Sequence, residues 1–172
     1  MAVNEELEEH VHHAQEPYEK VVAGTMAIIA VLLAVVSVLG QHFNTEMLLN
    51  QELSSDQWAY YQAKDIRRYV AQLAQDDLTQ MKAPAGAVQK YAQDAARYKS
   101  QSDQIQEHAR EYEKERNQAS VRAGRFHLGE IFLEVAIVFS SLAILFKRKL
   151  LFSAGIVSAI TGIVISIVGY WI

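Results

Sequence analysis

Cysteine is absent from the 172 residues of this chain, which excludes a secreted module held by disulfides and a zinc site made of thiolates. Proline occurs only twice and glycine eight times. Charge is also absent from three stretches, which are Val21–Leu39, Val135–Phe146 and Leu150–Ile172, whereas the region from Gln41 to Arg125 carries twelve basic and twelve acidic residues. Because apolar and charged residues are segregated in this way, the composition excludes a single soluble globular domain.

The apolar stretches predict an integral membrane protein, because about 20 residues of helix at about 1.5 Å per residue cross a bilayer. We expect transmembrane helices at residues 21–40, 126–146 and 150–172, the last two joined by a basic loop at 147–149. Residues 1–20 hold six glutamates and one lysine. This acidic, histidine-containing tail lacks the basic start of a signal peptide, so the first apolar stretch is expected to be retained as a span.

The region 41–125 is composed mostly of good helix formers and is interrupted by Pro84 and Gly86. We therefore expect two long helices that fold back on each other at a turn spanning residues 82–86. The returning arm shows alternating steps of three and four, typical of a coiled coil. The positions in this series are Val88, Tyr91, Ala95, Tyr98, Ser102, Ile105, Ala109, Tyr112, Arg116, Ala119, Ala123 and Phe126.

The outgoing arm carries a matching apolar series, which is expected to face the tyrosines of the returning arm. Its members are Ala59, Ala63, Ile66, Val70 and Leu73. Ser54 and Gln57 have the spacing of a capping box, so the helix is expected to restart at Ser54, with Gln41–Leu53 as a kink or joint. The predicted fold class is an all-α membrane protein with three transmembrane helices and a long antiparallel coiled-coil hairpin inserted between the first and second.

A two-helix hairpin with alanine, serine and arginine in its seam buries little apolar area, and isolated cores of this kind are marginal. The first span also carries small residues in steps of four and three, among them Ala23, Ala27, Ala30 and Ala34, where another helix can approach closely. Both features predict a homo-oligomer.

Four residues form a candidate polar site: Glu130, Glu134 and His127 near the start of the second span, and His42 at the exit of the first span, at the same membrane level. A carboxylate near the centre of a span costs about 2.5 to 3.5 kcal/mol and must be paired, protonated or hydrated. Two interpretations remain open. The cluster binds cations or protons at the mouth of a pore, or it is an interfacial polar group that locks helix packing.

No catalytic, metal or cofactor site is predicted. His10, His12 and His13 have a spacing that can hold a transition metal, but no second set of ligands accompanies them. Phosphate loops, nucleophile elbows and HExxH pairs do not occur, so we do not expect an enzyme. The balanced charge of the middle region argues against nucleic acid as a partner.

The run from Ser55 to Lys64, Ser-Asp-Gln-Trp-Ala-Tyr-Tyr-Gln-Ala-Lys, resembles a segment of the bacterial family called "domain of unknown function 4337". The similarity extends to the span at Leu128–Phe146 and to the basic turn before a last apolar span. The resemblance implies a bacterial membrane protein and supplies no activity or cofactor. Within this run, Trp58, Tyr60 and Tyr61 are either a docking site for a partner or part of an oligomer core.

The short basic loop Lys147-Arg148-Lys149 predicts orientation, because basic residues in short loops favour the cytoplasmic side. The hairpin then lies in the periplasm of a bacterial inner-membrane protein. Basic residues on the other side of the second span, such as Arg122 and Arg125, oppose this assignment. The expected function is a non-enzymatic homo-oligomeric scaffold or interaction protein that presents a helical stalk, with another protein as an expected partner of the hairpin. The alternative is an oligomeric cation or proton channel or transporter.

Overall fold

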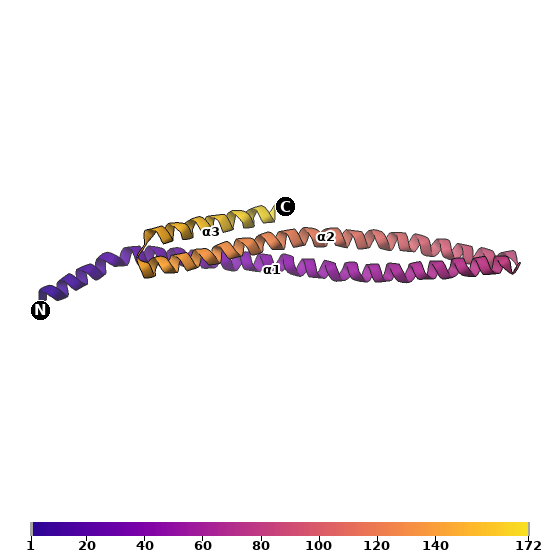
Figure 1. Ribbon diagram of the computed structural model, residues 1–172, viewed down its shortest axis with the longest axis horizontal. Coiled ribbons are helices and arrows are strands. Elements are labelled where there is room, and N and C mark those ends of the chain that lie inside the picture. The colour runs from indigo at the N-terminus through magenta and orange to yellow at the C-terminus, as the bar shows by residue number, and fades with distance from the viewer. Residues whose placement is uncertain (1, 172) are drawn as a thin grey trace. The chain divides into compact units, whose positions relative to one another are not determined.

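The computed structural model describes the backbone of residues 2–171 and the side chains of residues 17–171. It contains three helices: α1 (Ala2–Gln80), α2 (Ala85–Phe146) and α3 (Lys149–Tyr170) (Figure 1). The described residues contain no strand, so the prediction of an all-helical chain is confirmed. Each of the three helices includes a segment long and apolar enough to cross a membrane.

The chain divides into two compact units. The three-helix unit comprises Met1–Asn44 and Ser120–Ile172, and the two-helix unit comprises Thr45–Ala119. Each unit is described by itself below.

The expected restart of the helix at Ser54 is wrong, because α1 continues through Gln41–Leu53 without a break. No glycine or proline lies in this segment, and nothing else in it stops backbone hydrogen bonding from one turn to the next. Ser54 is therefore not a helix cap. Its side chain is buried, and its hydroxyl donates to the carbonyl oxygen of Ala109 at 3.4 Å.

The turn between α1 and α2 covers residues 81–84 instead of the expected 82–86. Lys82 has a positive φ of 52°, the amide of Ala83 donates to Leu78, and that of Lys82 donates to Thr79. This is the Schellman arrangement that ends many helices. Pro84 follows it, where a proline cannot continue the helix, and Gly86 is already part of α2.

In the three-helix unit, α2 and α3 approach each other closely through small residues. The buried residues of α3 are Gly155, Ala159, Gly162, Ser166 and Gly169. A Cβ added at Gly129 would lie 2.8 Å from the carbonyl oxygen of Gly162, and one added at Gly162 would lie 2.7 Å from that of Gly129. Only glycine permits this separation of the two backbones.

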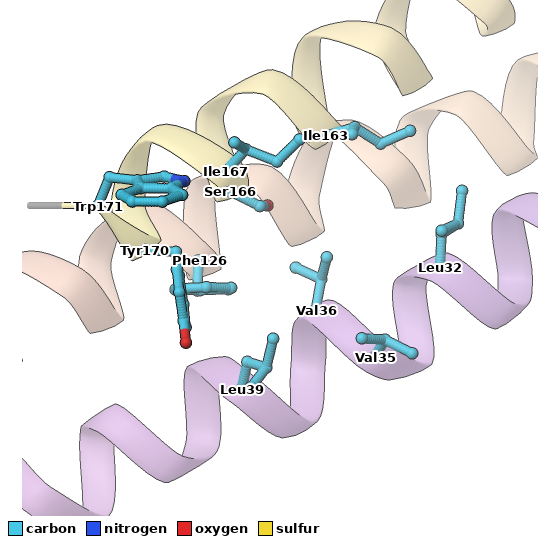
Figure 2. Close-up of a pocket in the computed structure, with 10 residues that line it drawn as sticks. All are labelled: Leu32, Val35, Val36, Leu39, Phe126, Ile163, Ser166, Ile167, Tyr170 and Trp171. Carbon is cyan, nitrogen blue, oxygen red and sulfur yellow. The ribbon is translucent and has the colours of Figure 1, made fainter.

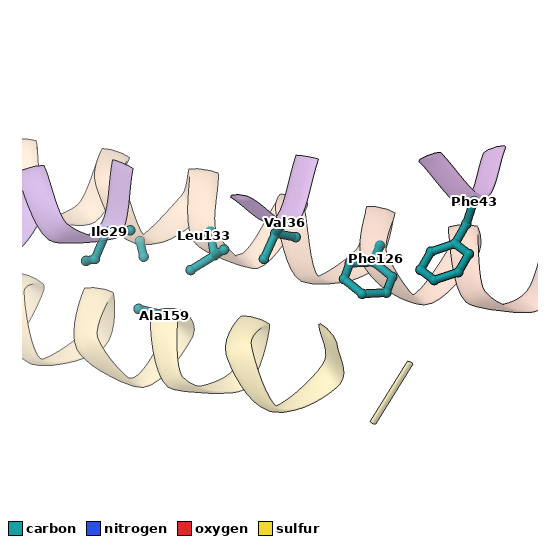
Figure 3. Close-up of a cluster of buried hydrophobic side chains, with 7 residues drawn as sticks. Ile29, Val36, Phe43, Phe126, Leu133 and Ala159 are labelled. Atoms are coloured by element: carbon teal, nitrogen blue, oxygen red, sulfur yellow. The ribbon is translucent and has the colours of Figure 1, made fainter. Parts of the chain in front are cut away.

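The same unit contains an apolar cavity of about 330 Å³ between α1 and α3, with Phe126 of α2 in its lining (Figure 2). Beside it lies the apolar core, which includes Ile29, Val36 and Phe43 of α1 and Phe126 and Leu133 of α2 (Figure 3). Val22 is buried as well, so the buried residues of α1 recur every seven positions. Such a repeat keeps one face of a helix against a neighbour.

In the two-helix unit, α2 turns the expected face inward, because none of the residues of its predicted seam in this unit is exposed. Ala95, Ser102, Ile105, Ala109 and Ala119 are buried.

The expectation for α1 in this unit is wrong, since all five residues of its predicted apolar series are exposed. The exposed fractions of Ile66, Val70 and Leu73 are 63%, 62% and 63%. The face of α1 that contacts α2 mixes polar residues with apolar ones such as Ala71 instead. Trp58 Nε1 donates to Glu113 Oε1 at 2.9 Å, and Lys64 Nζ donates to Gln101 Oε1 at 3.0 Å.

Candidate functional site

We call the exposed series on α1 the apolar stripe: Ala59, Ala63, Ile66, Val70 and Leu73. Its steps of four, three, four and three place all five side chains on one face of the helix. Two further exposed aromatic residues, Tyr60 and Tyr69, border it. The stripe lies outside the three uncharged stretches of the chain, in a helical segment whose other exposed positions include Glu52, Asp76 and Asp77. Exposed apolar side chains gathered on one helix face are typical of interaction sites.

The heptad positions that flank the stripe carry little charge. In a parallel pairing of two such helices, each residue at position g faces the residue five places later on the partner. Gln62 would therefore face Arg67, and Tyr69 would face Ala74. Neither pair sets like charges against each other, so a second copy in the same direction meets no electrostatic opposition along the stripe.

The structure separates the three aromatic residues that the sequence grouped together. Trp58 and Tyr61 are half-buried, and their rings meet edge to face with centroids 5.5 Å apart. Tyr60 is exposed, and Lys64 Nζ lies 5.2 Å from the centre of its ring. Trp58 and Tyr61 are thus part of the packing within the two-helix unit, whereas only Tyr60 is available beside the apolar stripe.

The predicted polar cluster is brought together only in part. His127 Nδ1 lies 3.5 Å from Glu130 Oε2, and the Glu130 side chain is 25% exposed. His42 is exposed and its ring meets that of Phe43 edge to face. Glu134 is exposed on α2, within the apolar segment. Leu133 and Ala136 occupy the inward face instead. The other histidine group, at positions 10, 12 and 13, lies outside residues 17–171, the range whose side chains the structure describes.

The polar inner face of α1 in the two-helix unit was missed by sequence reasoning, which followed apolar spacing alone. A signal for it exists. The seven-residue repeat Val22, Ile29, Val36 and Phe43, if carried along an unbroken helix, reaches Asn50, Gln57, Lys64, Ala71 and Leu78. None of these five residues is exposed.

Comparison with known families finds one match. The model described as "Domain of unknown function (DUF4337)" matches residues 18–172 and confirms the resemblance seen in the sequence. No curated protein and no solved structure matches the chain.

Proposed function

The chain belongs to the DUF4337 family, and we propose that it is a non-enzymatic membrane scaffold. In this proposal three helices cross the bacterial inner membrane, and residues 45–119 form an antiparallel coiled-coil hairpin outside the bilayer, on the periplasmic side. Several copies assemble in parallel through the apolar stripe, and the resulting stalk is the surface presented to other proteins.

The observation that carries the proposal is the exposure of Ile66, Val70 and Leu73, each above 60%, on a helix whose inner face includes the polar residues Asn50 and Ser54. Apolar side chains exposed to water lose the roughly 25 cal/mol per Å² that burial supplies. The contacts within one chain leave this stripe uncovered while charged groups occupy the seam. A second copy would cover the stripe and supply the apolar contacts that the two-helix unit lacks.

The membrane helices support association as well. Ala23, Ala27, Ala30 and Ala34 are exposed on α1 of the single chain, so their small side chains face away from α2 and α3. Small residues at this spacing permit close helix packing within a bilayer. Glu134, exposed on an apolar segment, is covered or hydrated more easily in an oligomer than in a single chain facing lipid.

The test uses the absence of cysteine from the natural chain. In a parallel assembly each stripe residue faces the same residue of the neighbouring chain. Val70→Cys should therefore form disulfide-linked dimers in native membranes under mild oxidation. Gln72→Cys is the matched control, since Gln72 is also exposed and lies two residues away, off the stripe. We expect at least several-fold more dimer from Val70→Cys. Equal crosslinking of the two variants, or monomer alone in both, would contradict the proposal.

One observation favours a second candidate function. Glu134 is an exposed carboxylate within the apolar segment of α2. Carboxylates at such positions commonly mark ion or proton pathways. In an oligomer a ring of Glu134 side chains, with Glu130 and His127 near its entrance, would bind cations or protons.

A further inference from the structure

The cavity of the three-helix unit is lined almost entirely by hydrocarbon. Leu32, Val36 and Leu39 of α1 face Ile163 and Ile167 of α3 across it (Figure 2). Among the aliphatic part of the wall the one hydroxyl belongs to Ser166, and it donates to the carbonyl oxygen of Gly162 at 2.9 Å. Because this polar group is already satisfied, the cavity suits an apolar ligand.

One end of the cavity differs from the rest, because aromatic and cationic groups gather there. Tyr170 and Trp171 line it, with ring centroids 6.3 Å apart. Such residues mark the boundary between hydrocarbon and headgroups in membrane proteins. Arg125 packs against Gly169, the residue that precedes Tyr170, since a Cβ added there would lie 2.8 Å from Arg125 Cβ.

A second guanidinium lies at the same end. Arg122 is placed over the ring of Phe43 at 5.5 Å, and that ring lies 5.4 Å from the ring of Phe126, which lines the cavity. Within the described part of the chain, Arg122 Nε is buried and has no hydrogen-bond partner. Glu130, the next acidic residue along α2, lies beside His127. Two arginines therefore lie next to residues at this end of the hydrocarbon-lined cavity, Arg125 beside Gly169 and Arg122 beside Phe43, and both can donate to an anion.

We propose that this cavity binds one acyl chain of an anionic phospholipid, with the lipid phosphate at Arg122 and Arg125. A guanidinium group donates two parallel hydrogen bonds to phosphate oxygens. An apolar helix has no anionic oxygen that could accept them. A helix of a second copy is the competing occupant, and its apolar side chains would leave the two guanidinium groups without an anion. The inference rests on the proposed membrane location and is independent of the apolar stripe.

The experiment offers the purified full chain in detergent an equimolar mixture of phosphatidylglycerol and phosphatidylcholine, and native mass spectrometry counts the lipids that each chain retains. We expect one phosphatidylglycerol per chain, with about tenfold preference over phosphatidylcholine. The double variant Arg122→Gln/Arg125→Gln should lose the preference. Ile167→Trp should lose the lipid by filling the cavity.

Ile160→Trp is the control for Ile167→Trp, because Ile160 is similarly exposed on the same face of α3, two turns away, and is not part of the lining. It should retain the lipid. Equal retention of the two lipids by the natural chain, or loss of lipid in both tryptophan variants, would overturn the inference. A disulfide between one copy that carries only Val36→Cys and another that carries only Ile163→Cys would also overturn it, because that bond would place another subunit in the cavity.

These outcomes are separate from those for the scaffold. A chain that requires detergent, and forms dimers through Val70→Cys, but shows no preference for phosphatidylglycerol, retains its proposed function and lacks the lipid site. A chain that stays soluble without detergent fails in both respects.

Discussion

At the scale of single residues, backbone conformation at the helix ends determines which side chain is tolerated best. Lys82 and Lys147 both have positive φ, 52° and 51°. Lys147 directly follows α2, and Lys82 follows α1 after one intervening residue, Met81. A side chain with a Cβ pays roughly 1 kcal/mol or more for this conformation, whereas glycine adopts it freely. The lysine at position 82 therefore makes the turn between α1 and α2 less stable than a glycine there would.

Replacing Lys82 with glycine should stabilise the chain by about 0.5 to 1 kcal/mol, because the left-handed position of the Schellman turn then carries no Cβ. The free energy of unfolding in urea, followed by circular dichroism of the full chain in detergent, measures the effect. Lys90→Gly is the matched control, since Lys90 is exposed inside α2. There glycine should destabilise the chain by about 1 kcal/mol. A loss of stability in both variants would refute the assignment of the turn.

At the scale of helices, close backbone packing joins α2 to α3. The hydroxyl of Ser158 donates to the carbonyl oxygen of Phe132 at 2.7 Å, and Gly129 and Gly162 leave room for the two backbones. In lipid, where water offers no hydrophobic driving force between helices, van der Waals packing and such hydrogen bonds supply the association energy.

Gly129→Ala should weaken this helix pair by about 1 to 3 kcal/mol, because the added methyl group would meet Ser166 and the carbonyl oxygen of Gly162. Gly124→Ala, five residues earlier in the same helix, meets nothing within 4 Å. It should raise stability by about 0.5 to 1 kcal/mol through helix propensity alone. Thermal unfolding in a single detergent compares the two. Similar effects of both substitutions would show that α3 does not pack against α2 at Gly129.

At the scale of the whole molecule, the scaffold and the channel make different predictions for Glu134. The scaffold proposal expects no ion flux above that of empty liposomes, either for the natural chain or for Glu134→Gln. It also expects the variant to assemble, since the apolar stripe on α1 through which the copies are proposed to associate is unchanged in it.

Flux measurements with a fluorescent proton or potassium indicator in liposomes decide between the two functions. Glu115→Gln is the control, because Glu115 is exposed in the two-helix unit, outside the apolar segments. Flux through the natural chain and the control, with loss in Glu134→Gln, would contradict the scaffold and favour the channel.

The sequence alone determined the helical class, the three apolar segments, the place of the turn within two residues and the family. These properties follow from local causes: the length of uncharged stretches, the scarcity of glycine and proline, and a short diagnostic run around Trp58. The inward face of α2 also followed from its spacing, since Ala95, Ser102 and Ile105 are buried as the period requires.

Only the tertiary structure decided which face of α1 meets α2. Two series with helical spacing compete on that helix, and the apolar one, with Ile66 and Val70, was expected to turn inward. Within the two-helix unit, Trp58 and Lys64 hydrogen-bond to Glu113 and Gln101 of α2, so this face of α1 is turned inward. The apolar stripe lies on another face of the same helix and remains exposed. Spacing along the sequence ranks neither series above the other, because both have a helical period; the contacts with α2 decide between them.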